Sequence, residues 1–147
     1  MKTLLKNAQQ SLRDKFGYIR SVDIFITPHE NFIPRGTQFP AIGIKDGGID
    51  RTRLMGGEQE DQILTITYIP YVRFFSSDQV IIGTDVEKGL LDVVEELHAA
   101  LKGNFLGDPG VEDIFSKTEK PSENFGKEGD GLQRKLVPYQ YERRITV

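Results

Sequence analysis

The amino-acid sequence predicts an α+β fold for residues 1–147: one mixed or mostly antiparallel β-sheet of about five or six strands, with two α-helices packed on one face. The length of 147 residues suits a single domain with one hydrophobic core. Two segments carry apolar residues at helical spacing. Most other segments alternate apolar and polar residues, as strands with one buried face do.

The first helix is expected over residues 3–16, where apolar side chains recur every three or four positions. Gly17 follows at the usual position of a left-handed C-terminal cap. A strand is expected next, from Val22 to Thr27. Residues 28–38 contain two prolines and a glycine and are expected to form a mobile loop. A loop of this length in a compact domain is often functional.

A β-hairpin is expected after this loop. Its first strand runs from Pro40 to Lys45, and Asp46-Gly47-Gly48 is a favourable turn sequence. The return strand would be Ile49 to Leu54. Gly56-Gly57 and the acidic residues after them predict a second turn.

The longest strand is expected over Ile63 to Phe75, with alternate residues from Leu64 onward on one face. Pro70 cannot donate to a β-ladder, so it predicts a sheet edge or a bulge. A long helix follows over residues 84–102, with Thr84 and Glu87 as a capping box. Its expected apolar stripe comprises Val86, Leu90, Leu91, Val94, Leu97, His98 and Leu101.

Gly103 is expected to end this helix. A strand is expected over Val111 to Lys117, and a closing strand over Leu132 to Val147. Between them, residues 117–131 are charged and rich in glycine, so this loop is expected to be mobile in the free protein. The sheet face away from the helices looks mixed and polar, and would be wet or covered by another subunit.

Composition and charge exclude several classes of protein. The formal net charge of -3 argues against a sequence-specific nucleic-acid binder, which needs clustered Lys and Arg. The chain has no cysteine, which excludes disulfides and thiolate metal sites and favours assembly in the cytoplasm over secretion. Polar residues interrupt the N-terminal apolar segment too early for a signal peptide, and no apolar run is long enough for a membrane span.

The two histidines are weak candidates for chemistry. His98 forms a single E-x-x-H pattern with Glu95, and a metal site needs more ligands, so we interpret it as a helix boundary residue rather than a ligand. His29 is either a solvated loop residue or a general base, but no nucleophile motif accompanies it. We therefore expect no catalytic residue, no metal site and no cofactor.

The charged segments between residues 45 and 61 leave alternatives open. The glycines lack the Lys-Ser/Thr of a phosphate-binding loop, so turns explain them. The acidic residues of this region do not have EF-hand spacing, so a solvated acidic rim is favoured over a cation site. Arg51 and Arg53 would share a strand face, with Lys45 across the hairpin, as a basic patch or as charges that protect an exposed edge from aggregation.

The order of these elements resembles a known family. FPAIGIKDGG, then a long alternating strand, then GTDVEKGLLDVVEELHAALKGN resembles the tail-terminator and tail-completion (minor tail) proteins of tailed bacteriophages. The resemblance extends through Val111 to Ile114 and the closing strand around Tyr139 to Glu142, so it is spread over most of the chain.

This resemblance implies a structural phage or prophage tail protein. Such proteins form a ring, commonly a hexamer, at the end of the tail tube, where they terminate tail growth and provide the head-joining surface. The implied partners are further copies of the chain, the major tail tube protein and a head-completion or connector protein, and DNA can pass through the ring. The implied location is the virion tail, assembled in the cytoplasm of the bacterial host.

A closed ring uses a heterologous interface, so different patches of one surface must complement each other. The basic and acidic segments of residues 45–61 and several phenylalanines could supply this. The candidate interface residues are Lys45, Arg51, Arg53, Glu58, Glu60, Asp61, Phe32, Phe39, Phe74 and Phe75. The alternatives are another minor tail or head–tail connector protein, a small hydrolase that uses His29, and a regulatory binding module.

Overall fold

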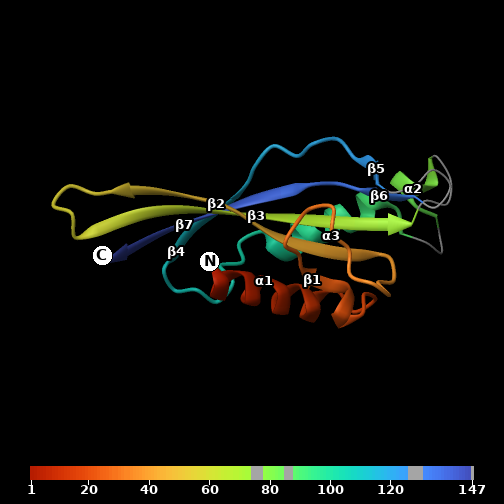
Figure 1. The fold of residues 1–147 in the computed structure, drawn as a ribbon, viewed down its shortest axis with the longest axis horizontal. Coiled ribbons are helices and arrows are strands. Elements are labelled where there is room, and N and C mark those ends of the chain that lie inside the picture. Colours follow the sequence, from red (N-terminus) through yellow and green to blue (C-terminus); the bar gives the residue numbers. More distant parts are fainter. Residues whose placement is uncertain (74–77, 85–87, 126–130, 147) are drawn as a thin grey trace.

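The computed structural model describes residues 1–73, 78–84, 88–125 and 131–146. Within these ranges the chain forms one mixed sheet of seven strands, with two helices of several turns packed against it, which confirms the α+β prediction (Figure 1). No helix in the described ranges has the length and apolar character needed to cross a membrane.

The helices are α1 (Lys2–Lys15), α2 (Gln79–Ile82) and α3 (Leu90–Leu101). The strands are β1 (Ile24–Ile26), β2 (Ala41–Arg53), β3 (Gln59–Arg73), β4 (Val111–Ser116), β5 (Glu123–Phe125), β6 (Leu132–Arg134) and β7 (Val137–Thr146). Hydrogen-bonded neighbours run β1-β2-β3-β6-β5, while β7 pairs with both β3 and β4. β1 is parallel to β2, and the other pairs are antiparallel.

Both α1 and α3 bury their apolar stripes against the same face of the sheet. The core between them comprises Leu4, Ala8, Leu12, Leu90, Val93, Val94, Leu97 and Leu101 from the helices, with Ile42, Ile44, Leu64, Ile66, Tyr68, Val137, Tyr139 and Tyr141 from the strands. The alternation predicted for β3 and β7 places these strand residues on the helix side, as expected. Burial of this apolar surface is the main stabilising contribution to the fold.

The end of α1 differs from the prediction. Gly17 does not adopt a left-handed conformation. Instead, the buried Phe16 leaves the helix with φ of -102°, and its N–H still donates to the carbonyl of Leu12 at 2.9 Å. Burial of this aromatic ring in the core turns the chain, so no glycine cap is required. After Phe16, the expected strand from Val22 is shorter because a 3-10 turn occupies Ser21–Asp23.

The prediction of one helix over residues 84–102 was wrong at its start. α3 begins at Leu90, and the carboxylate of Asp92 accepts a hydrogen bond from the Gly89 N–H at 3.0 Å. Thr84 is therefore not the cap, and Glu87 lies outside the described residues. A Cβ at Gly89 would lie 2.3 Å from the nitrogen of Gly83, so the chain passes close to the end of α2 where only glycine fits.

The stripe predicted for α3 is confirmed in part: Val86 lies outside the described residues, and Val93 and Ala100, which the prediction left out, are buried. Leu97 and the other core leucines are buried, but Leu91 is 37 % exposed and does not belong to the stripe. Gly103, with φ of 70°, follows the last turn as predicted.

The predicted turn at residues 46–48 was also wrong, because β2 continues through it. Asp46 pairs with Ile66 and Ile49 with Leu64, so Gly47 and Gly48 together oppose one residue, Thr65. This is a β-bulge. The hairpin turn instead lies at residues 54–58, around the two glycines predicted as a second turn. Tertiary pairing with a 15-residue partner strand overrides the local turn preference.

Pro70 lies inside the sheet, paired with Ile42, and not at an edge. On the side of β3 away from β2, the sheet is interrupted at Pro70. β7 pairs with β3 only as far as Tyr68, and β6 ends with Arg134 opposite Tyr71. The proline therefore lies where β7 gives way to β6, so the sheet accommodates a residue that cannot donate.

The expected closing strand is likewise divided into β6 and β7 by a two-residue break at 135–136, and residue 147 lies outside the described residues. The β4 prediction is confirmed. The loop expected at 117–131 contains β5, which pairs with β6, and its residues 126–130 lie outside the described part of the chain.

The second sheet face is not uniformly polar. A small cluster on that side contains Phe25, Ala41, Ile69 and Tyr71. Ile33 and Phe39 from the loop at 28–40 pack against it, together with Leu132 and Leu136. The loop therefore covers this part of the face. Among the described residues, this cluster does not extend to the other half of the face.

Candidate assembly interface

A polar arm projects beyond the helices at one end of the molecule (Figure 1). We define the arm as residues 49–53 of β2, 59–63 of β3 and 142–146 of β7, with the hairpin turn at residues 54–58. No side chain between residues 46 and 61 is buried, and the one buried side chain of the arm, Gln62, is polar. At about 3.3 Å per residue, β3 is roughly 50 Å long, much longer than the core it crosses. The arm lacks a hydrophobic layer of its own.

The strand register assigns each arm residue to one of two faces. Ile49 opposes Leu64 of the core, so Arg51 and Arg53, two and four positions later, lie on the same side of the sheet as the helices. Arg51 opposes Gln62, and Gln62 opposes Arg143. We call this side of the arm the helix-side face. It carries three arginines, and its one acidic arm residue is Glu60.

The opposite side, which we call the far face, is acidic. Asp50 opposes Ile63, Ile63 opposes Glu142, and Glu142 opposes Asp113 of the neighbouring β4. The next row of the arm holds Thr52, Asp61 and Arg144. Three carboxylates therefore share one row, and Arg144 is the one basic side chain that the register places on this face of the arm.

Ion pairs within the chain neutralise part of the charge on both faces. Nε of Arg51 lies 4.0 Å from the Glu60 carboxylate. Arg144 donates to Asp61 at 2.7 Å, and this hydrogen bond holds the pKa of the Asp61 carboxyl below its ordinary value. Arg143 donates to the side-chain amide oxygen Oε1 of Gln62 at 2.9 Å and to the Asp108 carboxylate at 3.3 Å.

The structure thus brings some predicted interface residues together and separates others. Glu60 lies in β3 on the same face as Arg51 and Arg53, whereas Asp61 lies on the far face beside Arg144, and Glu58 is in the exposed turn. Lys45 lies on the opposite sheet face from Arg51 and donates to its neighbour Asp46 at 2.6 Å.

Two of the phenylalanine candidates, Phe32 and Phe39, lie outside the arm, in the segment between β1 and β2. Phe32 is 49 % exposed in the loop after β1. Phe39 packs against the small second cluster, with the Arg73 guanidinium 5.8 Å from its ring centroid. Phe74 and Phe75 lie outside the described residues.

His98 has partners that the sequence did not indicate. Its Nδ1 is hydrogen-bonded to the Tyr139 hydroxyl and its Nε2 to the Glu119 carboxylate, not to Glu95. Lys135 lies 2.9 Å from the other oxygen of Glu119. A carboxylate can only accept, so Nε2 carries a proton and donates. Both ring nitrogens are therefore engaged within the protein.

The pKa shifts around this group point to a structural network. Burial raises the pKa of the Tyr139 hydroxyl, and the charge of Glu119 adds to this effect, so the phenol stays protonated. Burial alone would raise the pKa of Glu119, but hydrogen bonds from Lys135 and His98 outweigh it and hold that pKa below its ordinary value. The network ties the segment after β4 to α3 and β7.

A cavity of about 480 Å³ adjoins His98. Its lining residues are His98, Ala99, Lys102, Gly103, Ile114, Phe115, Ser116 and Tyr139. The second histidine is elsewhere: His29 is exposed, and its Nδ1 accepts a hydrogen bond from the Asn31 N–H at 3.0 Å. Among the described residues, no cluster of His, Asp and Glu is arranged to hold a metal ion.

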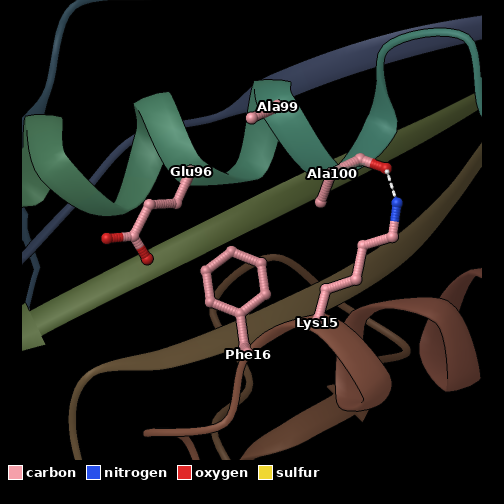
Figure 2. A pocket seen from close by; sticks show the side chains of 5 residues that line it. All are labelled: Lys15, Phe16, Glu96, Ala99 and Ala100. Atoms are coloured by element: carbon pink, nitrogen blue, oxygen red, sulfur yellow. Dashed lines mark hydrogen bonds between the residues drawn. The ribbon is translucent and has the colours of Figure 1, made fainter.

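A second cavity, of about 350 Å³, lies between the end of α1 and α3 (Figure 2). Figure 2 shows Lys15 reaching across it to the carbonyl oxygen of Ala100, which accepts from Nζ at 3.1 Å. A cation at this place complements the negative end of the α3 dipole. Phe16 and Glu96 form its other side, and nothing in this group resembles a catalytic arrangement.

Sequence reasoning missed Arg143, Glu142 and Asp113 as parts of the arm surface and Glu119 and Tyr139 as partners of His98. The alternation in the last strand was visible in the sequence and places Glu142 and Arg144 on one face. Pairing of β7 between β3 and β4 is long-range, and no local pattern reveals it.

Comparison of the chain with models of protein families and with curated proteins finds no match. The resemblance drawn from the order of elements therefore stays a hypothesis, and function must be argued from the surface.

Proposed function

We propose that the protein is a structural component of a phage or prophage tail, which forms a ring at the end of the tail tube, terminates tail growth and provides the head-joining surface. The observation that carries this proposal is the arm. A three-stranded ribbon without a hydrophobic layer is marginal in isolation. Contact with neighbouring subunits would explain why these strands extend well beyond the domain core.

The sequence resemblance to tail-terminator and tail-completion proteins supports the same proposal. The partners would be further copies of the chain in a ring, commonly a hexamer, with the tail tube protein on one side and a head-completion or connector protein on the other. A different minor tail or connector role would use the same arm and is the nearest alternative.

The test uses tails assembled without this component. Purified protein is added, and electron microscopy then scores the tube ends and the joining of filled heads. We expect caps on tube ends and restored head joining, whereas tails without added protein stay open. Tubes that remain uncapped at saturating protein would contradict the proposal.

An enzyme is the second candidate, because His98 lines a cavity. Its ring would act as a base only after giving up the bond to Glu119 or Tyr139, so we assign it no catalytic role. No nucleophile motif accompanies His29 in the sequence, so we assign no catalytic role to it either. A hydrolase screen in which turnover disappears on His98→Ala or His29→Ala, with the fold intact, would reverse this assignment.

A further inference from the structure

We propose that the two faces of the arm form one interface, in which the basic helix-side face of one copy packs on the acidic far face of the next copy. This inference rests on the proposed function and deepens it by naming the contacting surfaces. The occupant of each face is a second copy of this chain.

The first step is the charge of the two faces. The helix-side face carries Arg51, Arg53 and Arg143 against two carboxylates, Glu60 and the Asp108 that pairs with Arg143. The far face carries Asp50, Asp61 and Glu142, joined by Asp113 of β4, against Arg144. One ribbon thus presents opposite charge on its two sides. Complementary potentials give an interface specificity and fix its orientation.

The second step is that several of these charged side chains do not form ion pairs within the described part of the chain. In the described ranges, no ion pair is found for Arg53, Asp50 or Asp113. Arg51 is 56 % exposed, and its distance to Glu60 is at the limit of an ion pair.

The third step is the repulsion on the far face. Asp50, Glu142 and Asp113 lie in one cross-strand row, separated by the apolar Ile63 between the first two. Like charges directly opposite each other, as Glu142 and Asp113 are, destabilise a sheet. Arginines of a neighbouring copy would relieve this repulsion, which the isolated domain cannot do.

The fourth step is symmetry. Two different faces of the same arm make a heterologous contact, because the basic face of one copy meets the acidic face of another. Repeating one such contact generates a closed ring when the rotation closes. The contact is therefore of the kind that the proposed function needs.

The test uses two variants with opposite defects. Arg51→Glu/Arg53→Glu makes both faces acidic, and Asp50→Lys/Asp113→Lys makes both faces basic. Each variant alone should self-associate at least ~10-fold more weakly than wild type, because like faces meet. Mixed at equal concentration and low ionic strength, they should form a mixed complex, which sedimentation velocity detects, and added salt should weaken it.

Arg35→Glu/Lys120→Glu is the matched control, because it reverses two exposed charges outside the arm. It should associate as wild type does and should not form a complex with the arginine variant beyond what wild type forms. Circular dichroism checks that all variants are folded. Absence of a mixed complex, or variants that each associate like wild type, would overturn the inference.

The outcome is separable from that of the proposed function. If the mixed complex fails to form while wild-type protein still caps tails, the arm faces are not the contact and the tail function stands. If the mixed complex forms but tails stay uncapped, the contact stands and the tail function fails.

Discussion

Leu97 and Leu91 show how one helix assigns the same residue type to two environments. Leu97 is fully buried between α3 and the sheet, while Leu91 is 37 % exposed. At 3.6 residues per turn, Leu91 lies about 100° around the helix from Leu90, on the side away from the buried Val93, so it is beside the apolar stripe and not within it. The prediction placed it in the stripe by counting apolar residues and not their angular positions.

These two leucines give a matched prediction. Leu97→Ala should lower the free energy of unfolding by roughly 2–5 kcal/mol, because it opens a cavity in the core. Leu91→Ala should lower it by about 1 kcal/mol or less, since much of its side chain is already in contact with water. Urea unfolding followed by circular dichroism measures both. Equal losses for the two variants would contradict the assigned helix face.

At the scale of an element, the bulge of β2 depends on one glycine and not on its neighbour. A Cβ at Gly47 would lie 2.8 Å from the carbonyl oxygen of Thr65, while a Cβ at Gly48 would meet nothing within 4 Å. Neither glycine needs a left-handed backbone, so only the contact with Thr65 separates them.

Gly47→Ala should therefore destabilise the protein by about 1–3 kcal/mol through overpacking against β3. Gly48→Ala should change the free energy of unfolding by no more than about 0.5 kcal/mol. Thermal and urea unfolding of the two variants make the comparison. A Gly48→Ala variant as unstable as Gly47→Ala would mean that the bulge is not where we place it.

The segment after β4 gives a prediction for pH. Glu119 has a pKa below its ordinary value of 4.5 in the folded state, so its contribution to stability is present above that pH and is lost as the pH falls through the lower, folded value. Glu119→Gln should therefore lower stability at neutral pH and reduce the loss of stability on acidification. Glu95→Gln, an exposed change on α3, should keep the wild-type pH dependence.

Urea midpoints measured from neutral pH down to below pH 4.5 test this prediction. A Glu119→Gln variant with the same pH dependence as wild type would show that the bonds from His98 and Lys135 do not stabilise the fold.

At the scale of the whole molecule, the domain divides into a core that folds and an arm that has no core. Replacement of residues 52–61 by Asn-Gly would close the hairpin after the Arg51–Gln62 pair with a two-residue turn. No side chain in the removed segment is buried, and its ion pairs, Glu60 with Arg51 and Asp61 with Arg144, are partly exposed. We expect the unfolding free energy to change by no more than about 1–2 kcal/mol.

The same shortened protein should lose self-association and should not cap tails, because the arm would no longer reach a neighbour. Size-exclusion chromatography and the tail-capping assay measure this, with circular dichroism as the control for folding. Unimpaired capping by the shortened protein would mean that assembly does not require the arm.

The sequence by itself determined the elements with strong periodicity. The stripe of α1, the alternation of β3 and β7 and the cap at Gly103 follow from local burial patterns and backbone preferences, and with them the α+β class. The sequence also placed Arg51 and Arg53 on one strand face, because the two-residue period of a strand is independent of its partners.

Only the tertiary structure decided the remaining features, and each depends on contacts between distant segments. β2 continues through Gly47-Gly48 because β3 offers it a long partner. α3 starts at Leu90 because the chain passes closely over Gly83. Glu119 reaches His98, and Asp113 joins Glu142, through strand pairings that no local pattern encodes. The acidic far face therefore exists only in the folded sheet, where residues from three separate segments meet in one row.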